Sequence, residues 1–462
     1  MLQKKSNKIF PFITLVKTPG IFHDVFMFIL GAIPAFCITF IIGINPSVTA
    51  FLVALVVFFE YLRRRQYFKI KKISLLNILF LFVLNFGMGY FIIGSGVSVF
   101  YIPFTIIPML VTILFGELVI SLLLTIASAV CIAALIGNSF ALMLIFLTGG
   151  IISIVLVFGV RRRITVIRAG FFIGMLQAGV LFLLNHFKII NSGAYTILIA
   201  NGFASGIIVL GVLPLFEYLF KTITNITLLE LADFNQPLLN RVMLEAPGTY
   251  HHSLIVGNLA DAASRAIGAN ALLARIGAYY HDIGKLQKPE YFSENQKLTD
   301  NKHDTLAPNM SKMIIMNHVK EGVEMAEKYH LSPQIIEFIE QHHGNSLVYY
   351  FYRRALERLE EDQGIKEEGF RYPGPKPNTK ETAIVLLADA VEAASRTLKE
   401  PTAGRIEEVV HKIINNKFID GQLDECDLTL KDMERIASVF VRVLGGMYHP
   451  RVDYPDHKHQ TE

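Results

Sequence analysis

Acidic residues and cysteines are both scarce in parts of this sequence, and each shortage excludes a class of protein. The 462 residues include three cysteines. Cys37 and Cys131 lie in apolar runs, so neither a disulfide framework nor a thiolate zinc site is available. The first half of the chain is nearly free of Asp and Glu, and 52% of all residues are hydrophobic. This composition is too apolar for an ordinary soluble protein and predicts that the first half lies in lipid.

Apolar stretches long enough to cross a bilayer follow one another as far as residue 220. The first stretch lacks the cleavage site of a signal peptide, so we interpret it as an additional anchor that precedes a seven-helix core over residues 46–220. The predicted spans are 21–43, 46–62, 73–93, 97–115, 117–137, 139–160, 169–187 and 194–220.

Basic residues between these spans predict the orientation of the chain. The loops 63–72 and 161–168 are rich in Arg and Lys, and the N-terminal segment 1–20 holds further lysines. Because positively charged loops stay in the cytoplasm, all of them agree with a topology in which everything beyond Lys221 is cytoplasmic. The formal net charge of +4 therefore reflects membrane topology and gives no indication of a nucleic acid partner.

Polar residues within the spans are interpreted as structural. Glu60, Glu117 and Glu217 fall near predicted helix ends, where they can reach water. The glycines between Gly202 and Gly206 favour close packing of helices over phosphate binding, since no strand precedes them. Transport is therefore disfavoured as a function.

Beyond Lys221 the sequence has helical periodicity and no strand pattern. We predict an all-α chain, in which a polytopic helical membrane domain is followed by an all-helical cytoplasmic domain over 221–448 and a flexible tail over 449–462. A segment rich in Pro and Gly between Glu361 and Lys380 predicts a surface loop beside the site, either a linker or a substrate lid. Helices are expected from 252 onward and at 271–282, 310–330, 333–342, 346–361, 379–399, 404–417 and 429–444.

This second half also contains imidazoles and carboxylates at intervals suited to a metal cage. Divalent transition metals prefer these ligands, and one carboxylate with two oxygens can bridge two ions. We predict Asp282 as the bridge. The other predicted ligands are His252, His281 and Asp389 for one ion, and His318, His342 and His343 for the second.

Such a cage predicts phosphoester hydrolysis. Two ions about 3.5 to 4 Å apart lower the pKa of a shared water and hold the attacking and leaving oxygens of a displacement at phosphorus. Lys285 is predicted to offer its ammonium to the phosphate, although a lysine at a helix end also complements the helix dipole. Asn295 and Arg396 are predicted substrate contacts.

Longer runs around these residues resemble the seven-transmembrane HD phosphodiesterases of the PgpH type, within the HD hydrolase superfamily. The resemblance covers roughly residues 46 to 445. The runs that carry it are Glu245-Ala-Pro-Gly-Thr-Tyr-His-His-Ser, Gly277-Ala-Tyr-Tyr-His-Asp-Ile-Gly-Lys-Leu, Pro289-Glu-Tyr-Phe-Ser-Glu-Asn-Gln, Gln341-His-His-Gly, Tyr372-Pro-Gly-Pro-Lys-Pro and Leu387-Ala-Asp-Ala-Val-Glu-Ala-Ala-Ser-Arg.

The resemblance implies a multi-pass protein of the bacterial inner membrane that hydrolyses cyclic di-AMP to linear pApA. It implies a dinuclear manganese or iron centre, whose activated hydroxide attacks phosphorus, in a cytoplasmic HD domain. In the family pattern the first ligand is the His directly before Ser, which selects His252 over His251.

Two departures from related patterns bear on regulation and substrate. Family members carry a large extracytoplasmic domain after the first anchor, whereas only residues 43–47 separate the first two predicted spans here, so an external sensor is expected to be missing. HD enzymes for cyclic di-GMP place Gly-Tyr-Pro shortly after the paired histidines, and no such signature follows His343. This favours cyclic di-AMP.

Two other functions remain open from the sequence. One is a membrane receptor whose HD domain binds a nucleotide without turnover, and the other is an HD nucleotidase that acts on mononucleotides. The predicted partners are a cyclic dinucleotide, the lipid bilayer and a second copy of the chain in a homodimer, with no nucleic acid polymer.

Overall fold

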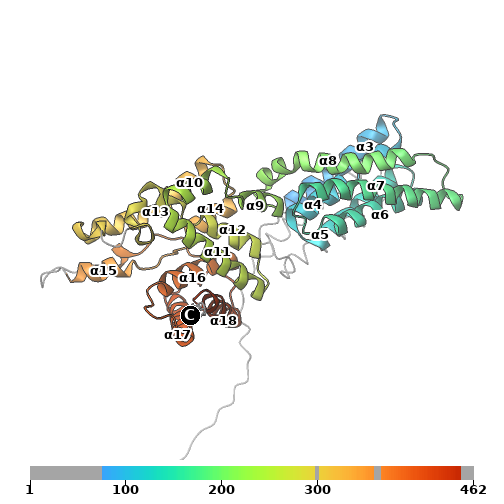
Figure 1. Cartoon of the computed structure of the whole chain (residues 1–462). Helices are drawn as coiled ribbons and strands as arrows, with labels where there is room; N and C mark the ends of the chain where they lie inside the picture. Colours follow the sequence, from blue (N-terminus) through green and yellow to red (C-terminus); the bar gives the residue numbers. More distant parts are fainter. Residues whose placement is uncertain (1–74, 297–300, 358–365, 449–462) are drawn as a thin grey trace, which may run out of the picture. The chain divides into compact units, whose positions relative to one another are not determined.

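The computed structural model describes residues 75–296, 301–357 and 366–448, and these residues form two compact units (Figure 1). The first unit is Met1–Phe216 and the second is Glu217–Glu462. The described residues are helical and contain no strand, apart from one isolated bridge between Leu347 and Arg371, which confirms the predicted all-α class. The segment 1–20, the spans predicted at 21–43 and 46–62, and the tail 449–462 lie outside the described residues.

The first unit contains long apolar helices that match four predicted spans within three residues, and a fifth that begins at Arg163, six residues before the span predicted at 169–187. Five of its described helices are long and apolar enough to cross a membrane. Their charged residues are few, so a bilayer is the solvent in which such surfaces are stable. The helices are α3 (Leu75–Gly94), α4 (Ile106–Phe115), α5 (Leu118–Leu135), α6 (Phe140–Val157), α7 (Arg163–His186) and α8 (Tyr195–Phe220), preceded at α4 by the short η1 (Val99–Tyr101).

The span predicted at 97–115 is not one continuous helix. It consists of η1 and the ten-residue α4, separated by an extended stretch that contains Pro103. A proline removes a backbone donor and leaves carbonyl groups without helical partners. The side chain of Asn201 on α8 donates to the carbonyls of Phe100 and Ile102, at 2.9 Å each. Asn201 therefore satisfies two carbonyls that the interrupted helix leaves without partners, which agrees with the structural role predicted for polar residues within the spans.

Helices α7 and α8 approach each other through glycines. A Cβ atom at Gly202 would lie 2.5 Å from the carbonyl oxygen of Gly170 and 2.6 Å from the amide nitrogen of Gly174. A Cβ at Gly206 would lie 2.9 Å from the carbonyl oxygen of Val166. The two backbones are thus too close for any side chain, which confirms that these glycines serve helix packing.

The second unit is a bundle of shorter helices that follow the predicted periodicity. Glu217 accepts hydrogen bonds from the amide of Thr224 and the hydroxyl of Thr227, and so holds the start of α9. The helices are α9 (Asn225–Leu231), α10 (Pro237–Glu245), α11 (Pro247–Ile267), α12 (Ala271–Tyr280), α13 (Pro308–Lys328), α14 (Pro333–Gln341), α15 (Tyr349–Leu356), α16 (Lys380–Ser395), α17 (Ala403–Ile419) and α18 (Leu430–Met447).

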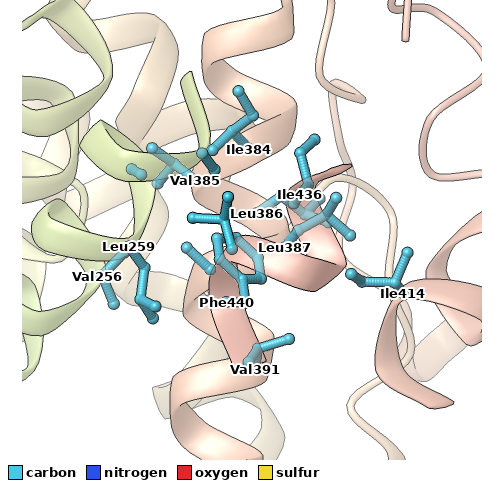
Figure 2. Packing of buried hydrophobic residues seen from close by; sticks show 14 of the residues in the cluster. Val256, Leu259, Ile384, Val385, Leu386, Leu387, Val391, Ile414, Ile436 and Phe440 are labelled. Atoms are coloured by element: carbon cyan, nitrogen blue, oxygen red, sulfur yellow. The ribbon is translucent and has the colours of Figure 1, made fainter. Parts of the chain in front are cut away.

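The core of this unit forms where α11, α16 and α18 meet (Figure 2). Val256 and Leu259 on α11 face Leu386 and Val391 on α16, and Phe440 of α18 fills the space between them. All five side chains are buried. Removing this apolar area from water stabilises the three helices against one another and fixes the positions of the polar residues on their neighbouring turns.

Candidate metal centre

Seven buried or half-buried side chains from five parts of the second unit converge on one point, and we call them the ligand cluster. α11 and α16 contribute one residue each, the turn after α12 contributes two, α13 contributes one, and the turn after α14 contributes two. The members are His252, His281, Asp282, His318, His342, His343 and Asp389, and all are buried except His343, which is partly exposed. The structure therefore brings together every ligand that was predicted from the sequence.

Asp282 lies between two groups of imidazoles. Its Oδ2 is 3.5 Å from His252 Nε2 and 3.2 Å from His281 Nε2. Its Oδ1 is 3.4 Å from His318 Nε2 and 3.6 Å from His342 Nε2. Each carboxylate oxygen thus faces a different pair of histidines, which is the arrangement that a bridging ligand needs.

The tautomers of these histidines follow from their second ring nitrogens. His281 Nδ1 donates to the carbonyl of Ala278 at 2.6 Å, and His318 Nδ1 donates to that of Ile315 at 2.5 Å. His342 Nδ1 donates to the carbonyl of Ile339 at 2.9 Å. A ring that donates through Nδ1 presents a lone pair at Nε2 when it is neutral. Three lone pairs therefore point into the ligand cluster.

The closest pair of these nitrogens tests whether a metal fits. His318 Nε2 and His342 Nε2 are 3.1 Å apart, and each ring donates to a backbone carbonyl through Nδ1, so each neutral ring presents a lone pair at Nε2. Two lone pairs at this distance repel each other unless a cation lies between or beside them. Ligand atoms of three residue groups lie within 4.8 Å of one another: His318 with His342 and His343, His252 with His281 and Asp389, and His281 with Asp282 and His342. The donor set fits divalent metal ions.

Burial and neighbouring charges set protonation in the ligand cluster. At His252 burial lowers the pKa, but the hydrogen bonds to Asp389 and Glu392 outweigh it and raise the pKa to about 10. Burial lowers the pKa of His318 to about 3 and holds the pKa of His343 well below its usual value, so both rings are neutral at physiological pH. Burial raises the pKa of Asp282, but the neighbouring His281 and Lys285 lower it further, and the carboxylate is ionised. Neutral imidazole and ionised carboxylate are the forms that bind metals.

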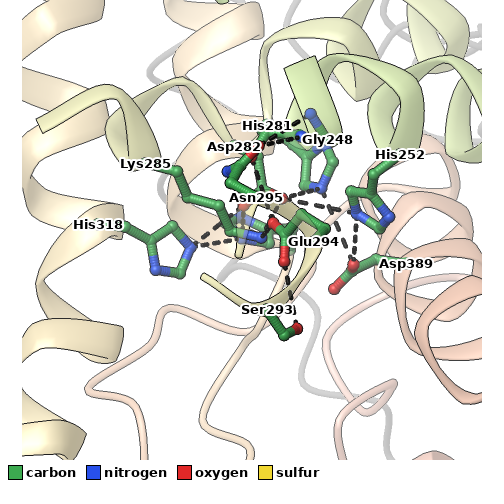
Figure 3. A network of polar contacts seen from close by, with 12 residues as sticks. Gly248, His252, His281, Asp282, Lys285, Ser293, Glu294, Asn295, His318 and Asp389 are labelled. Carbon is green, nitrogen blue, oxygen red and sulfur yellow. Dashed lines mark hydrogen bonds and ion pairs between the residues drawn. The ribbon is translucent and has the colours of Figure 1, made fainter. Parts of the chain in front are cut away.

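Lys285 pairs with two carboxylates beside the ligand cluster (Figure 3). Its Nζ is 2.7 Å from Asp282 Oδ2 and 2.7 Å from Glu294 Oε1. Burial lowers the pKa of Lys285, but these two carboxylates raise it more strongly, so the ammonium stays charged. The lysine does not end the preceding helix as the sequence predicted, because α12 ends at Tyr280 and Lys285 lies in the 3-10 turn η2 (Ile283–Gln287).

Asn295, a predicted substrate contact, caps a helix that carries a ligand. Its Oδ1 accepts from the amides of Gly248 and Thr249, at 2.8 and 3.1 Å, and its Nδ2 donates to the Thr249 hydroxyl. These bonds hold the start of α11, which carries His252 one turn later. They occupy the side chain without a substrate, so a substrate contact at Asn295 stays a prediction.

Glu392 is a residue of the site that the sequence did not reveal. Its Oε2 lies 2.6 Å from His252 Nδ1, and its Oε1 accepts from Arg396 Nε at 2.5 Å. The carboxylate thus orients the His252 ring, and Arg396 holds the carboxylate. Glu392 lies one turn beyond Asp389 on α16, and this spacing was the available signal. A substrate contact at Arg396, which is bonded in this way, stays a prediction.

Gly284 explains how Asp282 comes so close to His318. A Cβ atom at Gly284 would overlap the carbonyl oxygen of His318 and lie 2.5 Å from the amide nitrogen of Gly322. Only a glycine lets the turn η2 contact the backbone of α13. The Gly after His-Asp-Ile is therefore part of the site because it sets a distance between ligands.

The segment between Glu361 and Lys380 reaches the ligand cluster, as predicted, through Tyr372. The Tyr372 ring stacks on the His343 ring, with centroids 4.4 Å apart and planes at 28°. Its backbone amide donates to the carbonyl of Ser346, at 3.0 Å. This contact joins the loop to the edge of the metal centre, and no short-range sequence signal indicated it.

These features define the class: a polytopic helical membrane protein with a second helical domain whose buried His and Asp side chains could hold metal ions. Comparison with protein families agrees with this two-part organisation. Residues 38–224 match the model of the 7TM receptor with intracellular HD hydrolase, and residues 249–394 match the HD domain.

Two curated relatives agree with these family matches over most of the chain. The chain is 37% identical over 435 residues to cyclic-di-AMP phosphodiesterase PgpH of Bacillus subtilis, a match that covers 90% of this chain and 60% of the relative. It is 40% identical over 366 residues to cyclic-di-AMP phosphodiesterase PgpH of Listeria monocytogenes, which covers 78% of this chain and 51% of the relative. The chain thus spans about half to three fifths of the length of these relatives.

Among solved structures, the HD domain of L. monocytogenes PgpH is 47% identical in sequence to the matching part of this chain. It matches with a TM-score of 0.45 over 46% of this chain and all of that domain. The chain belongs to the family of 7TM receptors with an intracellular HD hydrolase, as its sequence motifs predicted.

Proposed function

We propose that this chain is a membrane-anchored, metal-dependent phosphodiesterase that hydrolyses cyclic di-AMP to pApA. The observation that carries the proposal is the position of Asp282, whose two oxygens face two separate sets of histidines. The substrate is supported by the relatives, which are named cyclic-di-AMP phosphodiesterases, and by the absence of Gly-Tyr-Pro after His343.

In this proposal the ligand cluster holds two manganese or iron ions. Such ions supply a nucleophilic water of lowered pKa and neutralise charge on the phosphorus oxygens. The side chains proposed to hold them are His252, His281 and Asp389 for one ion and His318, His342 and His343 for the other, with Asp282 shared.

The protein itself contributes orientation, charge and exclusion of water. The carbonyls of Ala278, Ile315 and Ile339 fix three of the imidazole rings. Lys285 keeps its proton, since two carboxylates raise its pKa, so we propose that it acts as a fixed cation beside the scissile phosphate and not as a proton donor. Near-complete burial of the ligands keeps bulk water from competing with the substrate.

We place the HD domain at the cytoplasmic face of the bacterial inner membrane. The support is the distribution of Arg and Lys between the spans, together with apolar helices in the first unit. A homodimer stays a prediction.

The proposal is tested with full-length protein in detergent, loaded with Mn²⁺ and incubated with cyclic di-AMP. We expect linear pApA, detected by chromatography, and Asp282→Ala should lower kcat by more than about 100-fold because the shared ligand is lost. His251→Ala is the matched control, since His251 is adjacent to a ligand but exposed, and it should keep its activity.

Other outcomes identify the competing functions. If the protein binds cyclic di-AMP tightly but forms no product, the chain is a receptor and not a phosphodiesterase. Hydrolysis of mononucleotides in preference to cyclic di-AMP would indicate a nucleotidase.

A further inference from the structure

Lys417 on α17 is a half-buried lysine that forms no salt bridge within the part of the chain that the structure describes. Its Nζ donates to the hydroxyl of Ser346 at 2.7 Å. Among the described residues, no carboxylate lies within ion-pair distance of Nζ. Lys285 differs, because two carboxylates lie 2.7 Å from its ammonium. An ammonium removed from water without an anion is costly, so Lys417 is poised to bind one.

Lys417 is joined to the ligand cluster through Ser346 and is not itself a member of it. Ser346 closes the turn that starts at His343, since its amide donates to the carbonyl of His343 at 3.0 Å. The carbonyl of Ser346 in turn accepts from the amide of Tyr372, whose ring stacks on His343. Burial lowers the pKa of Lys417, and the charges of Asp389 and Asp420 partly oppose that change.

Other charged and polar groups near this turn are already engaged. Arg371 pairs with Asp420 at 2.8 Å and with Glu367 at 2.7 Å. The side chain of Gln422 accepts from the amide of Asn345 at 3.0 Å and donates to its Oδ1 at 2.6 Å. These contacts hold the turn without help from Lys417. The lysine is therefore available for a ligand, because only one of its three donors is used by a described residue.

We propose that the Lys417 ammonium binds the second, non-scissile phosphate of a dinucleotide substrate. This inference rests on the proposed phosphodiesterase function. A cyclic dinucleotide carries two phosphodiesters, each with one negative charge. When the scissile group is held at the ligand cluster, the second phosphate needs a cation close to the cluster but outside it. Lys417 satisfies both conditions, and the Ser346 hydroxyl orients its ammonium.

The test compares substrates with two phosphates and with one, using the full-length protein in detergent with Mn²⁺. Lys417→Met removes the charge but keeps an unbranched side chain. We expect it to raise the KM for cyclic di-AMP by roughly 10- to 100-fold, as for loss of a charge-assisted hydrogen bond. Turnover of bis(4-nitrophenyl) phosphate, which has one phosphate, should stay within about twofold, because its single phosphate occupies the metal centre.

Two further variants separate charge from structure. Lys417→Arg keeps a cation and should recover most of the affinity for cyclic di-AMP. Lys412→Met changes an exposed lysine of the same helix and should leave both substrates unaffected. Equal losses on both substrates in Lys417→Met would assign the residue a structural role and overturn the proposal, as would an unchanged KM for cyclic di-AMP.

A binding measurement keeps this inference distinct from the proposed function. If the wild-type protein does not hydrolyse cyclic di-AMP, the proposed function fails, but the dissociation constants of the wild type and Lys417→Met still decide the role of Lys417. Weaker binding of cyclic di-AMP by the variant supports the anion site. Equal binding rejects it.

Discussion

The two units bury polar side chains through the same local hydrogen bond, with different consequences. In the first unit the hydroxyls of Thr112 and Thr125 donate to the carbonyls four residues earlier, at 2.7 Å each. In the second unit His281 and His318 donate through Nδ1 to the carbonyls three residues earlier. A hydroxyl uses its only proton in this bond and keeps only weakly basic lone pairs, whereas a neutral imidazole still presents a strongly basic lone pair at Nε2.

Because of this difference, the buried hydroxyls of the first unit serve only helix packing, whereas the buried imidazoles of the second unit can also bind a ligand. The hydroxyls of α4 and α5 leave no donor directed at a ligand, so their helices pack as apolar surfaces would. The imidazoles are oriented by the same kind of bond while their second nitrogens face the two oxygens of Asp282, at 3.2 and 3.4 Å. Asn85 and Ser128 are buried in the first unit, and no hydrogen bond is found for them among the described residues. They do not converge with titratable groups in the way that the ligand cluster does.

The largest effect is expected from separating the ligands of the second unit with a single methyl group. Gly284→Ala would place a Cβ against the carbonyl of His318 and push η2 away from α13. Because Asp282 must reach histidines on both sides, we expect kcat to fall by more than about 100-fold and bound metal to decrease. Metal content by mass spectrometry and turnover of cyclic di-AMP measure these changes.

The control for this change is an alanine at a glycine with free space. Gly404 lies on α17 and has no atom within 4 Å of the position of a Cβ, so Gly404→Ala should stabilise the helix by about 0.5 to 1 kcal/mol and leave turnover unchanged. Normal metal content in Gly284→Ala would show that the close contact does not set the ligand positions.

An intermediate effect is expected when the orientation of one ring is lost. Glu392→Ala removes the acceptor of His252 Nδ1, which lies 2.6 Å away, and also releases Arg396. Partners of metal ligands contribute roughly 10- to 100-fold to affinity, so we expect a weakening of this size for Mn²⁺, measured by titration calorimetry. Glu392→Gln keeps an acceptor and should lose less. If the alanine variant binds Mn²⁺ as tightly as the wild type, the ring is oriented by packing alone.

The convergence of the ligand cluster could be predicted from the sequence because few residue types bind metals and the order of these residues was informative. Their partners could not be predicted with the same ease. Glu392 lies one turn from Asp389 and was accessible in principle, but the roles of Tyr372 and Lys417 depend on how distant segments fold against the turn after His343. Contacts of this kind are set by tertiary packing, which leaves no local pattern.

The helices show the same division. Their type in the described region followed from apolar length and periodicity, which are averages over many residues, whereas the short helices α9 and α10 were not among the expected ranges. The break at Pro103 was missed because the apolar character of residues 97–115 continues through it. The end of α12 at Tyr280 was missed because the 3-10 turn that follows depends on the contact of Gly284 with α13.

The smallest effect on catalysis is expected from a change in the first unit that is severe for packing. Gly202→Ala would place a Cβ 2.5 Å from the carbonyl of Gly170, and overpacking of this kind costs about 1 to 3 kcal/mol. We expect a lower unfolding temperature of the full-length protein in detergent, while kcat for cyclic di-AMP, measured well below that temperature, stays within about twofold. Gly211→Ala, on the same helix with no atom within 4 Å of the added Cβ, should leave both quantities unchanged. A large loss of kcat in Gly202→Ala, with Gly211→Ala unaffected, would show that packing of α7 against α8 controls turnover at the ligand cluster. The first unit would then contribute to catalysis although it holds none of the seven residues of that cluster.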